Sequence, residues 1–129
     1  MSAANLFISA DEHVQEHPDV WLKRLSRSKW GERIPHIEKN SSGSERWVVD
    51  GRTISLNGVA DCGAAMTDRT KRPQRWSEVP QAVYDPKEGL EVMDAAGITS
   101  AILYPTVAGI GGETLGRIED AELELACVQ

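Results

Sequence analysis

The stretch "DPKEGLEVMDAAGITSAILYP", residues 85–105, decides the fold class because it contains a whole helix followed by a strand. Asp85 suits the N-cap of this helix, the proline after it suits the first turn, and Glu88 can complete a capping box. Gly97 is placed to end the helix in the left-handed conformation. The apolar run 98–104 then predicts a fully buried strand.

Working outward, the N-terminal run "NLFIS" predicts a second strand over residues 5–13. Strand, helix and strand in this order predict an α/β fold with a parallel sheet. The long insertion 14–83 separates the first strand from the helix, and a β-hairpin is predicted within it near 45–56, where the Asp50-Gly51 pair suits a type I′ turn. The insertion also holds all the tryptophans: Trp21, Trp30, Trp47 and Trp76.

The C-terminal part, within 84–129, continues the same alternation. After the second strand comes the glycine-rich loop 106–118, and acidic residues then open a second helix at 119. Leu123, Ala126 and Cys127 form the apolar face of this helix. Neither glycine, proline nor a basic last turn precedes Gln129, so we expect the sequence to end within the helix.

The composition narrows the class of protein. The chain has 129 residues, enough for one domain. A formal net charge of -6 disfavours binding to nucleic acid and to anionic membranes. No apolar run approaches the roughly 18 residues of a transmembrane helix, and the N-terminus lacks the features of a signal peptide. Cys62 and Cys127 are too far apart for a disulfide framework, so we expect a protein of the reducing cytoplasm.

Residues 11–17, "DEHVQEH", match two different metal-binding patterns. If they were helical, His13 and His17 would form the His-x-x-Glu-His pattern of zinc peptidases. Pro18 follows at once, and a residue before proline is displaced from the helical region. The helical interpretation is therefore disfavoured, and His17 is expected to be a neighbour of the site rather than a ligand.

If the same residues form a strand, Asp11 and His13 point to one side and Glu12 to the other. A carboxylate and an imidazole side by side are two ligands for a divalent metal such as zinc. The carboxyl end of a strand is also where parallel α/β folds place their sites. A polar surface turn without a metal would give the same pattern, so the motif leaves both interpretations open.

Other candidate sites are weaker. The glycine loop lacks the Gly-Lys-Ser/Thr of a phosphate loop and has Thr114 where a third glycine would stand, so a flexible loop beside an active site is favoured. The basic stretch 69–76 is interpreted as a solvated loop rather than a nucleic-acid site. Cys62 has no identifiable base to activate it and is interpreted as an ordinary thiol. His36 is interpreted as an ordinary loop residue.

Three pieces in order resemble one family: "ISADEHVQEHPDVW" (8–21), "RWVVDG" (46–51) and "YDPKEGLEVMDAAGITSAILYPTVAG" (84–109). They are similar to the N-terminal part of the amidohydrolase-related family, in the branch of metal-dependent hydrolases and aromatic-acid decarboxylases. The resemblance covers nearly the whole chain but only about the first third of the family's domain, since a (β/α)8 barrel needs ~250 residues.

The resemblance implies the N-terminal part of a (β/α)8 TIM barrel, with its first two strands, its first helix and the insertion lying over the barrel mouth. It implies a divalent metal, most often zinc, with Asp11 and His13 matching the ligand pair of the family's first strand. The family's other ligands, histidines and an aspartate, lie on later strands that these residues do not contain. One departure is the Glu88-Gly89 pair, where relatives often have an arginine.

The implied activity is hydrolysis, or non-oxidative decarboxylation of a small carboxylic acid, and the sequence does not separate the two. The small-molecule substrate would be bound only by the complete enzyme, so the chain is expected to be inactive alone, and no catalytic residue is assigned within it. The alternative is a non-catalytic remnant or interaction subunit, because open strand edges favour association with another chain or with a second copy.

Overall fold

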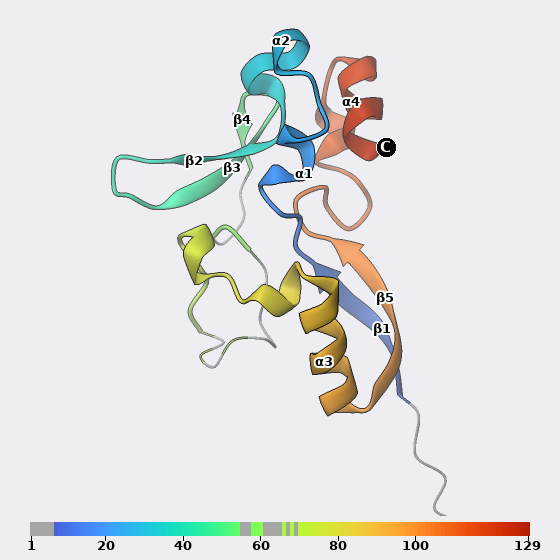
Figure 1. The fold of residues 1–129 in the computed structure, drawn as a ribbon. Helices are drawn as coiled ribbons and strands as arrows, with labels where there is room; N and C mark the ends of the chain where they lie inside the picture. Colours follow the sequence, from blue (N-terminus) through green and yellow to red (C-terminus); the bar gives the residue numbers. More distant parts are fainter. Residues whose placement is uncertain (1–6, 55–57, 61–65, 67, 69) are drawn as a thin grey trace, which may run out of the picture.

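The computed structural model describes residues 7–54, 58–60, 66, 68 and 70–129, and it has a mixed α/β fold (Figure 1). Strand β1 (Phe7–Val14) pairs in parallel with β5 (Ile98–Pro105). A separate antiparallel sheet has the order β2 (His36–Lys39), β3 (Glu45–Val49), β4 (Arg52–Thr53). The remaining elements are α1 (Asp19–Leu22), α2 (Arg27–Trp30), α3 (Pro86–Ala96), α4 (Ala121–Val128) and the 3-10 turns η1 (Gly31–Arg33), η3 (Trp76–Glu78), η4 (Gln81–Val83) and η5 (Leu115–Arg117).

Helix α3 leads directly into β5, and the residues at its two ends determine where it begins and ends. The Asp85 carboxylate accepts the backbone N–H of Lys87 at 2.9 Å, and Gly97 ends the helix with φ 72°. These two predictions are confirmed. The second half of the predicted capping box is wrong, because the backbone N–H of Asp85 donates to the carbonyl of Gln81 at 2.8 Å rather than to Glu88.

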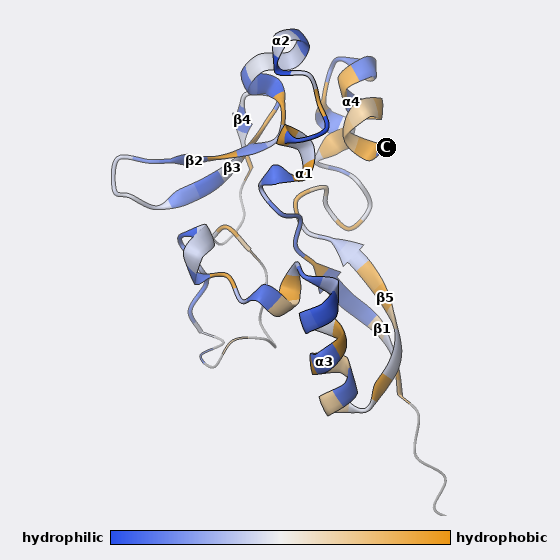
Figure 2. Ribbon diagram, viewed as in Figure 1, coloured by the Kyte–Doolittle hydropathy of each residue, from blue (hydrophilic) through white to orange (hydrophobic). Residues whose placement is uncertain are grey.

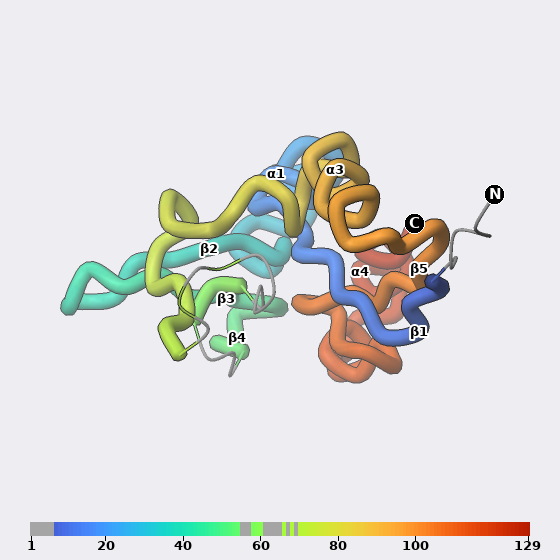
Figure 3. Tube along the Cα trace, turned by 90° about the horizontal axis from the view of Figure 1, so that it is seen from below, coloured from blue at the N-terminus to red at the C-terminus, as the bar shows by residue number. Residues whose placement is uncertain are grey.

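The parallel pair differs from prediction in its burial. The first strand is confirmed from Phe7, while Asn5 and Leu6 lie outside the described residues. The prediction that residues 98–104 are fully buried is wrong, since Ile102 is 52% exposed. Helix α3 lies along one side of the two strands (Figure 3) and leaves apolar side chains of β5 exposed. Leu90 and Val92 of α3 are themselves exposed.

Exposed apolar side chains gather on this unit, where Figure 2 colours segments of β5 and α3 as hydrophobic. Parallel sheets are normally covered on both faces, which is why their strands are rich in apolar residues. The strands of this unit are therefore as apolar as those of a sheet buried on both faces, but many of their apolar side chains are exposed. Its large exposed apolar residues are Phe7, Ile8, Leu90, Val92, Ile102 and Leu103.

The predicted hairpin is confirmed in its described part. Strands β3 (Glu45–Val49) and β4 (Arg52–Thr53) flank Asp50 with φ 50° and Gly51 with φ 72°, as a type I′ turn requires. Ser55 and Leu56, at the predicted end of the hairpin, lie outside the described residues.

A third strand, β2 (His36–Lys39), pairs with β3 and was not predicted. Interpreting His36 as an ordinary loop residue is wrong, because it begins β2 and is buried. Its Nδ1 lies 2.7 Å from the carbonyl oxygen of Ile34, and its Nε2 lies 3.0 Å from Glu38 Oε1. His36 is therefore held between backbone and side-chain partners on its own segment.

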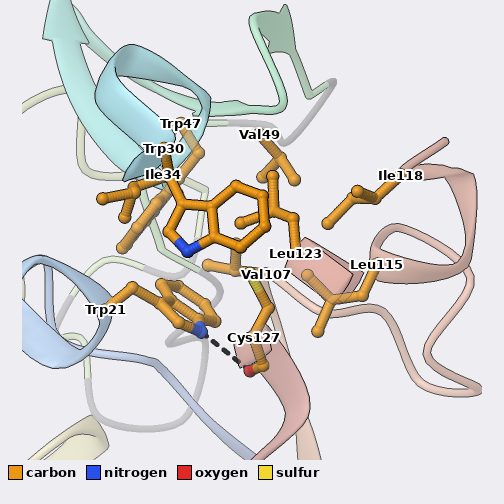
Figure 4. Close-up of a cluster of buried hydrophobic side chains, with 10 residues drawn as sticks. All are labelled: Trp21, Trp30, Ile34, Trp47, Val49, Val107, Leu115, Ile118, Leu123 and Cys127. Carbon is orange, nitrogen blue, oxygen red and sulfur yellow. Dashed lines mark hydrogen bonds between the residues drawn. The ribbon is translucent and has the colours of Figure 1, made fainter. Parts of the chain in front are cut away.

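The largest hydrophobic core joins the insertion to the segment after β5 (Figure 4). Trp21 donates its indole N–H to the carbonyl of Cys127 at 2.9 Å and packs edge-to-face on Trp47 with ring centroids 5.8 Å apart. Helix α4 faces this core with Leu123 and Cys127, as predicted. The buried members are Trp21, Trp30, Ile34, Trp47, Val49, Val107, Leu115, Ile118, Leu123 and Cys127.

This core lies beyond the carboxyl ends of β1 and β5, beside the antiparallel sheet (Figure 1). The insertion is therefore not an independent lobe, because residues that follow β5 complete its interior. Among the described residues, no helix combines the length and the apolar character needed to cross a membrane.

The buried tryptophans give a stability prediction. Trp47 is 1% exposed and donates its indole N–H to the carbonyl of Val59 at 2.9 Å. Replacing it by alanine leaves a cavity and an unpaired carbonyl, so Trp47→Ala should lower the free energy of unfolding by about 3–5 kcal/mol. Urea denaturation measures the change.

The matched control is Ile102→Ala, which removes an exposed apolar side chain from the parallel unit. We expect a loss of less than about 1 kcal/mol for this variant. Equal losses for the two variants would contradict the assignment of the core to the insertion.

Candidate functional site

Asp11 and His13 lie on β1, so the helical zinc-peptidase interpretation is wrong. The strand continues to Val14, and the next helix, α1, begins only at Asp19. His13 Nε2 lies 3.7 Å from Asp11 Oδ1, which places both side chains on the same side, as the strand interpretation predicts. The side chain of Asp11 is 87% exposed and that of His13 is 30% exposed, so the pair is open to solvent.

The pair lies beside an irregularity in the strand. Ser9 pairs with Ala101 and Glu12 with Leu103, so two residues of β1, Asp11 among them, stand opposite one residue of β5. Such a bulge bends a strand and redirects its side chains. Glu12 accepts the hydroxyl of Ser9 at 2.7 Å and so has a local partner.

On the neighbouring strand, Tyr104 borders the pair. It stands opposite His13 in the register, and the two rings are tilted by 44° with centroids 6.2 Å apart. No group of three histidine, cysteine or acidic side chains suited to a metal ion occurs within the described part of the chain. Asp11 and His13 therefore form a pair that no third such side chain joins among the described residues.

His17 belongs to a different environment. Its Nδ1 accepts the backbone N–H of Asp19 at 3.1 Å, which leaves the proton of the neutral ring on Nε2. The ring makes edge contacts with Trp76 and Tyr84, at centroid distances of 5.3 and 5.4 Å. His17 thus packs in an aromatic cluster with Trp76 and Tyr84 instead of joining Asp11 and His13.

The residue that sequence reasoning missed is Glu16. Its Oε2 accepts the backbone N–H groups of Val107 at 2.8 Å and Thr106 at 3.2 Å, and its Oε1 accepts that of Ala108 at 3.0 Å. The Thr106 hydroxyl also donates to the carbonyl of Val14 at 3.0 Å. These bonds connect the chain just after β1 to the chain just after β5. No local signal reveals them, because the partners are backbone groups 90 or more positions away.

The glycine-rich loop begins at this connection. Gly109 and Gly112 have φ values of 84° and 78°, conformations that favour glycine. The carboxylate of Glu113 accepts the backbone N–H of Gly111 at 2.9 Å. Bonds from its own backbone N–H and from that of Gly111, with the nearby charge of Arg117, lower the pKa of Glu113. The loop therefore presents backbone donors to a carboxylate.

The basic stretch and the cysteines are the remaining candidate sites. In the basic stretch, Lys71 pairs with Asp68 at 3.3 Å and Arg75 with Glu78 at 2.7 Å, as expected of a solvated loop. Cys62 and Arg69 lie outside the described residues. Cys127 is buried, and burial raises the pKa of its thiol to about 11, so at neutral pH it is a protonated, unreactive thiol.

No protein-family model and no curated protein matches the chain. The open carboxylate–imidazole pair can bind a cation from one side. The bonds of Glu16 hold the carboxyl end of β1, near this pair, to the chain after β5.

Glu16 gives the second prediction. Glu16→Gln replaces one acceptor oxygen by an amide group that cannot accept, so at least one of the three backbone N–H groups loses its partner. A hydrogen bond to a charged group contributes about 1.5–3 kcal/mol, and we expect a loss of that size in the free energy of unfolding. Thermal or urea denaturation checks it.

Glu91→Gln is the matched control, because Glu91 is exposed on α3. It should change stability by no more than about 0.5 kcal/mol. A Glu16→Gln variant as stable as this control would show that the connection contributes nothing.

Proposed function

We propose that Asp11 and His13 are half of a divalent-metal site, and that the chain contributes the first two strands of an amidohydrolase-like (β/α)8 barrel. The observation that carries this proposal is the open pair itself, 3.7 Å apart at the carboxyl half of β1. The parallel unit β1-α3-β5 supports it, because it is the repeating unit of such a barrel. So does the position of the insertion core beyond the carboxyl ends of the two strands.

The donor set fits a zinc-like ion. Carboxylate oxygen and imidazole nitrogen both bind zinc at about 2.0–2.2 Å, so two ligands of one ion lie at most about 4.4 Å apart. The measured 3.7 Å between Asp11 Oδ1 and His13 Nε2 falls within that limit. Neither side chain is fully buried, which leaves room for a cation and for further ligands.

A metal held there would polarise a carbonyl or activate water. The residues of this chain would hold and orient it, with the ring of Tyr104 bordering the site on β5. The substrate would be a small molecule with an ester, amide or carboxylate group. Hydrolysis and non-oxidative decarboxylation remain two versions of the proposal, because the group that protonates or deprotonates the substrate lies outside the proposed half-site.

A catalytic zinc needs three protein ligands. We propose that the others come from further barrel strands, whether in the same polypeptide or in a partner. The exposed apolar side chains of β1 and β5 support this requirement, because a completed barrel would cover them.

A second candidate function is a non-catalytic interaction subunit. The same exposed apolar residues on β1, β5 and α3 favour it, since contiguous apolar surface marks association sites. Under this alternative the chain would pair with another protein or with itself, and the Asp11–His13 pair would be a polar surface feature.

The third prediction is a zinc titration of the chain, followed by NMR of the three histidine rings. We expect the ring signals of His13 to shift with zinc while those of His36 do not, because both His36 nitrogens already face partners. Asp11→Asn should weaken binding at least about tenfold, since even outer-shell partners of a metal contribute 10–100-fold.

His17→Gln is the matched control, because it removes a nearby imidazole that contacts Trp76 and Tyr84 instead. It should leave zinc binding unchanged. If zinc shifts His17 first, or if His13→Ala binds zinc as well as the unaltered chain, the ligand assignment fails.

Sedimentation velocity with and without zinc separates the two candidate functions. Association that is independent of zinc, together with the absence of any zinc effect on His13, would favour the interaction subunit. A zinc effect on His13 that Asp11→Asn weakens would favour the half-site.

A further inference from the structure

A cavity of about 450 Å³ lies between the hairpin turn and the loop after β5. Val49 and Ile118, two members of the hydrophobic core, line its inner side, and Figure 4 shows both at the edge of that core. The charged and polar side chains around it come from β3–β4 and from the loop 106–118. They are Asp50, Arg52, Thr53, Thr106, Glu113, Thr114 and Arg117.

The two acidic residues of the lining already have partners. Asp50 Oδ1 accepts the guanidinium Nε–H of Arg33 at 2.7 Å, and its side chain is only 11% exposed. Arg33 does not line the cavity and also pairs with Asp120 at 3.2 Å. Glu113 is turned back onto its own loop, where it accepts the backbone N–H of Gly111. Both carboxylates therefore already have hydrogen-bond partners.

The two arginines of the lining are held loosely. Arg52 pairs with Glu119 at 2.8 Å, but both side chains are more than half exposed, and such surface pairs contribute little. Arg117 is exposed and acts on Glu113 through charge. Both guanidinium groups can therefore turn to an anion in the cavity at small cost.

The backbone of the loop 106–118 surrounds the carboxylate of Glu113. The Glu113 carboxylate lies close to the backbone of Gly109: a Cβ built on this glycine would stand 2.4 Å from the carboxyl carbon, so a side chain there would displace the carboxylate. The positive φ of Gly109 and Gly112 turns the backbone of this loop. Glu113 itself is exposed, so water can replace its bonds when it swings out.

We propose that this cavity binds a small organic molecule through its carboxylate group, which replaces the Glu113 carboxylate at the loop and is contacted by Arg52 and Arg117. Glu113 then acts as an internal competitor that holds the loop in shape until the ligand arrives. The apolar side chains of Val49 and Ile118 would face the body of the ligand. This inference stands on other residues than the metal proposal and holds whether or not Asp11 and His13 bind zinc.

The test is a titration of the chain with benzoate, inorganic phosphate and neutral benzamide at constant ionic strength. Amide signals of Gly109, Gly111 and Gly112 and the Nε–H signals of Arg52 and Arg117 report on the cavity. We expect benzoate to shift these signals with saturation, and to bind at least about tenfold more tightly than benzamide, because a charge-assisted contact is lost with the neutral probe.

Three variants sharpen the result. Glu113→Gln removes the competing charge and should tighten benzoate binding about threefold, the size expected for an exposed charge. Arg117→Gln should weaken it about tenfold. Arg24→Gln, an exposed arginine outside the lining, should have no effect.

Several outcomes would overturn the proposal. Equal affinity for benzoate and benzamide would remove the role of the carboxylate, and equal affinity for benzoate and phosphate would reduce the cavity to a general anion site. Unchanged binding in Glu113→Gln would contradict the displacement. Because these substitutions are at exposed positions, an unchanged unfolding midpoint shows that each variant is folded.

Discussion

The connection between the ends of the two parallel strands depends on one carboxylate, that of Glu16. Thr106 and Val107 are buried, and buried backbone N–H groups need acceptors. Glu16 accepts both of them and the N–H of Ala108, from a position two residues beyond the end of β1. The chain after β5 is thereby held against the chain after β1, and this is where Val107 enters the hydrophobic core. The glycine loop starts from the same point.

The molecule divides into a packed part and an open part. The insertion, with its tryptophans, packs against the segment that follows β5, and the side chains that they share in the core are buried. The parallel unit β1-α3-β5 leaves apolar side chains exposed, although its strands have the composition of a covered sheet. The Asp11–His13 pair lies on this open unit. Both proposed functions follow from that asymmetry, since each requires something to complete the open side.

The elements that the sequence predicts correctly are those whose cause lies within a few neighbouring residues. Asp85 and Gly97 mark the ends of α3 through contacts within a few residues, and Asp50-Gly51 needs only its own backbone angles to form the hairpin turn. The side-by-side placement of Asp11 and His13 followed from the two-residue period of a strand, despite the adjacent bulge. In each case the physical cause lies inside a short segment.

What the sequence did not reveal depends on distant partners. The bonds of Glu16 go to backbone groups that have no side-chain signature. Burial of residues 98–104 was inferred from their apolar character, but burial depends on what covers a strand rather than on the strand. His36 looked like a loop residue because β2 is short and receives its register from β3. The cavity beside the glycine loop likewise exists only because the hairpin and the loop meet.

Amide hydrogen exchange at Thr106, Val107 and Ala108 tests the central claim most directly, that Glu16 joins the ends of the two parallel strands. The account predicts that these three amides exchange as slowly as the paired amides of β3, because each is hydrogen-bonded and opens only when the surrounding structure opens. Exchange at the rate of an unstructured peptide would contradict it, since the amides would then have no lasting partner.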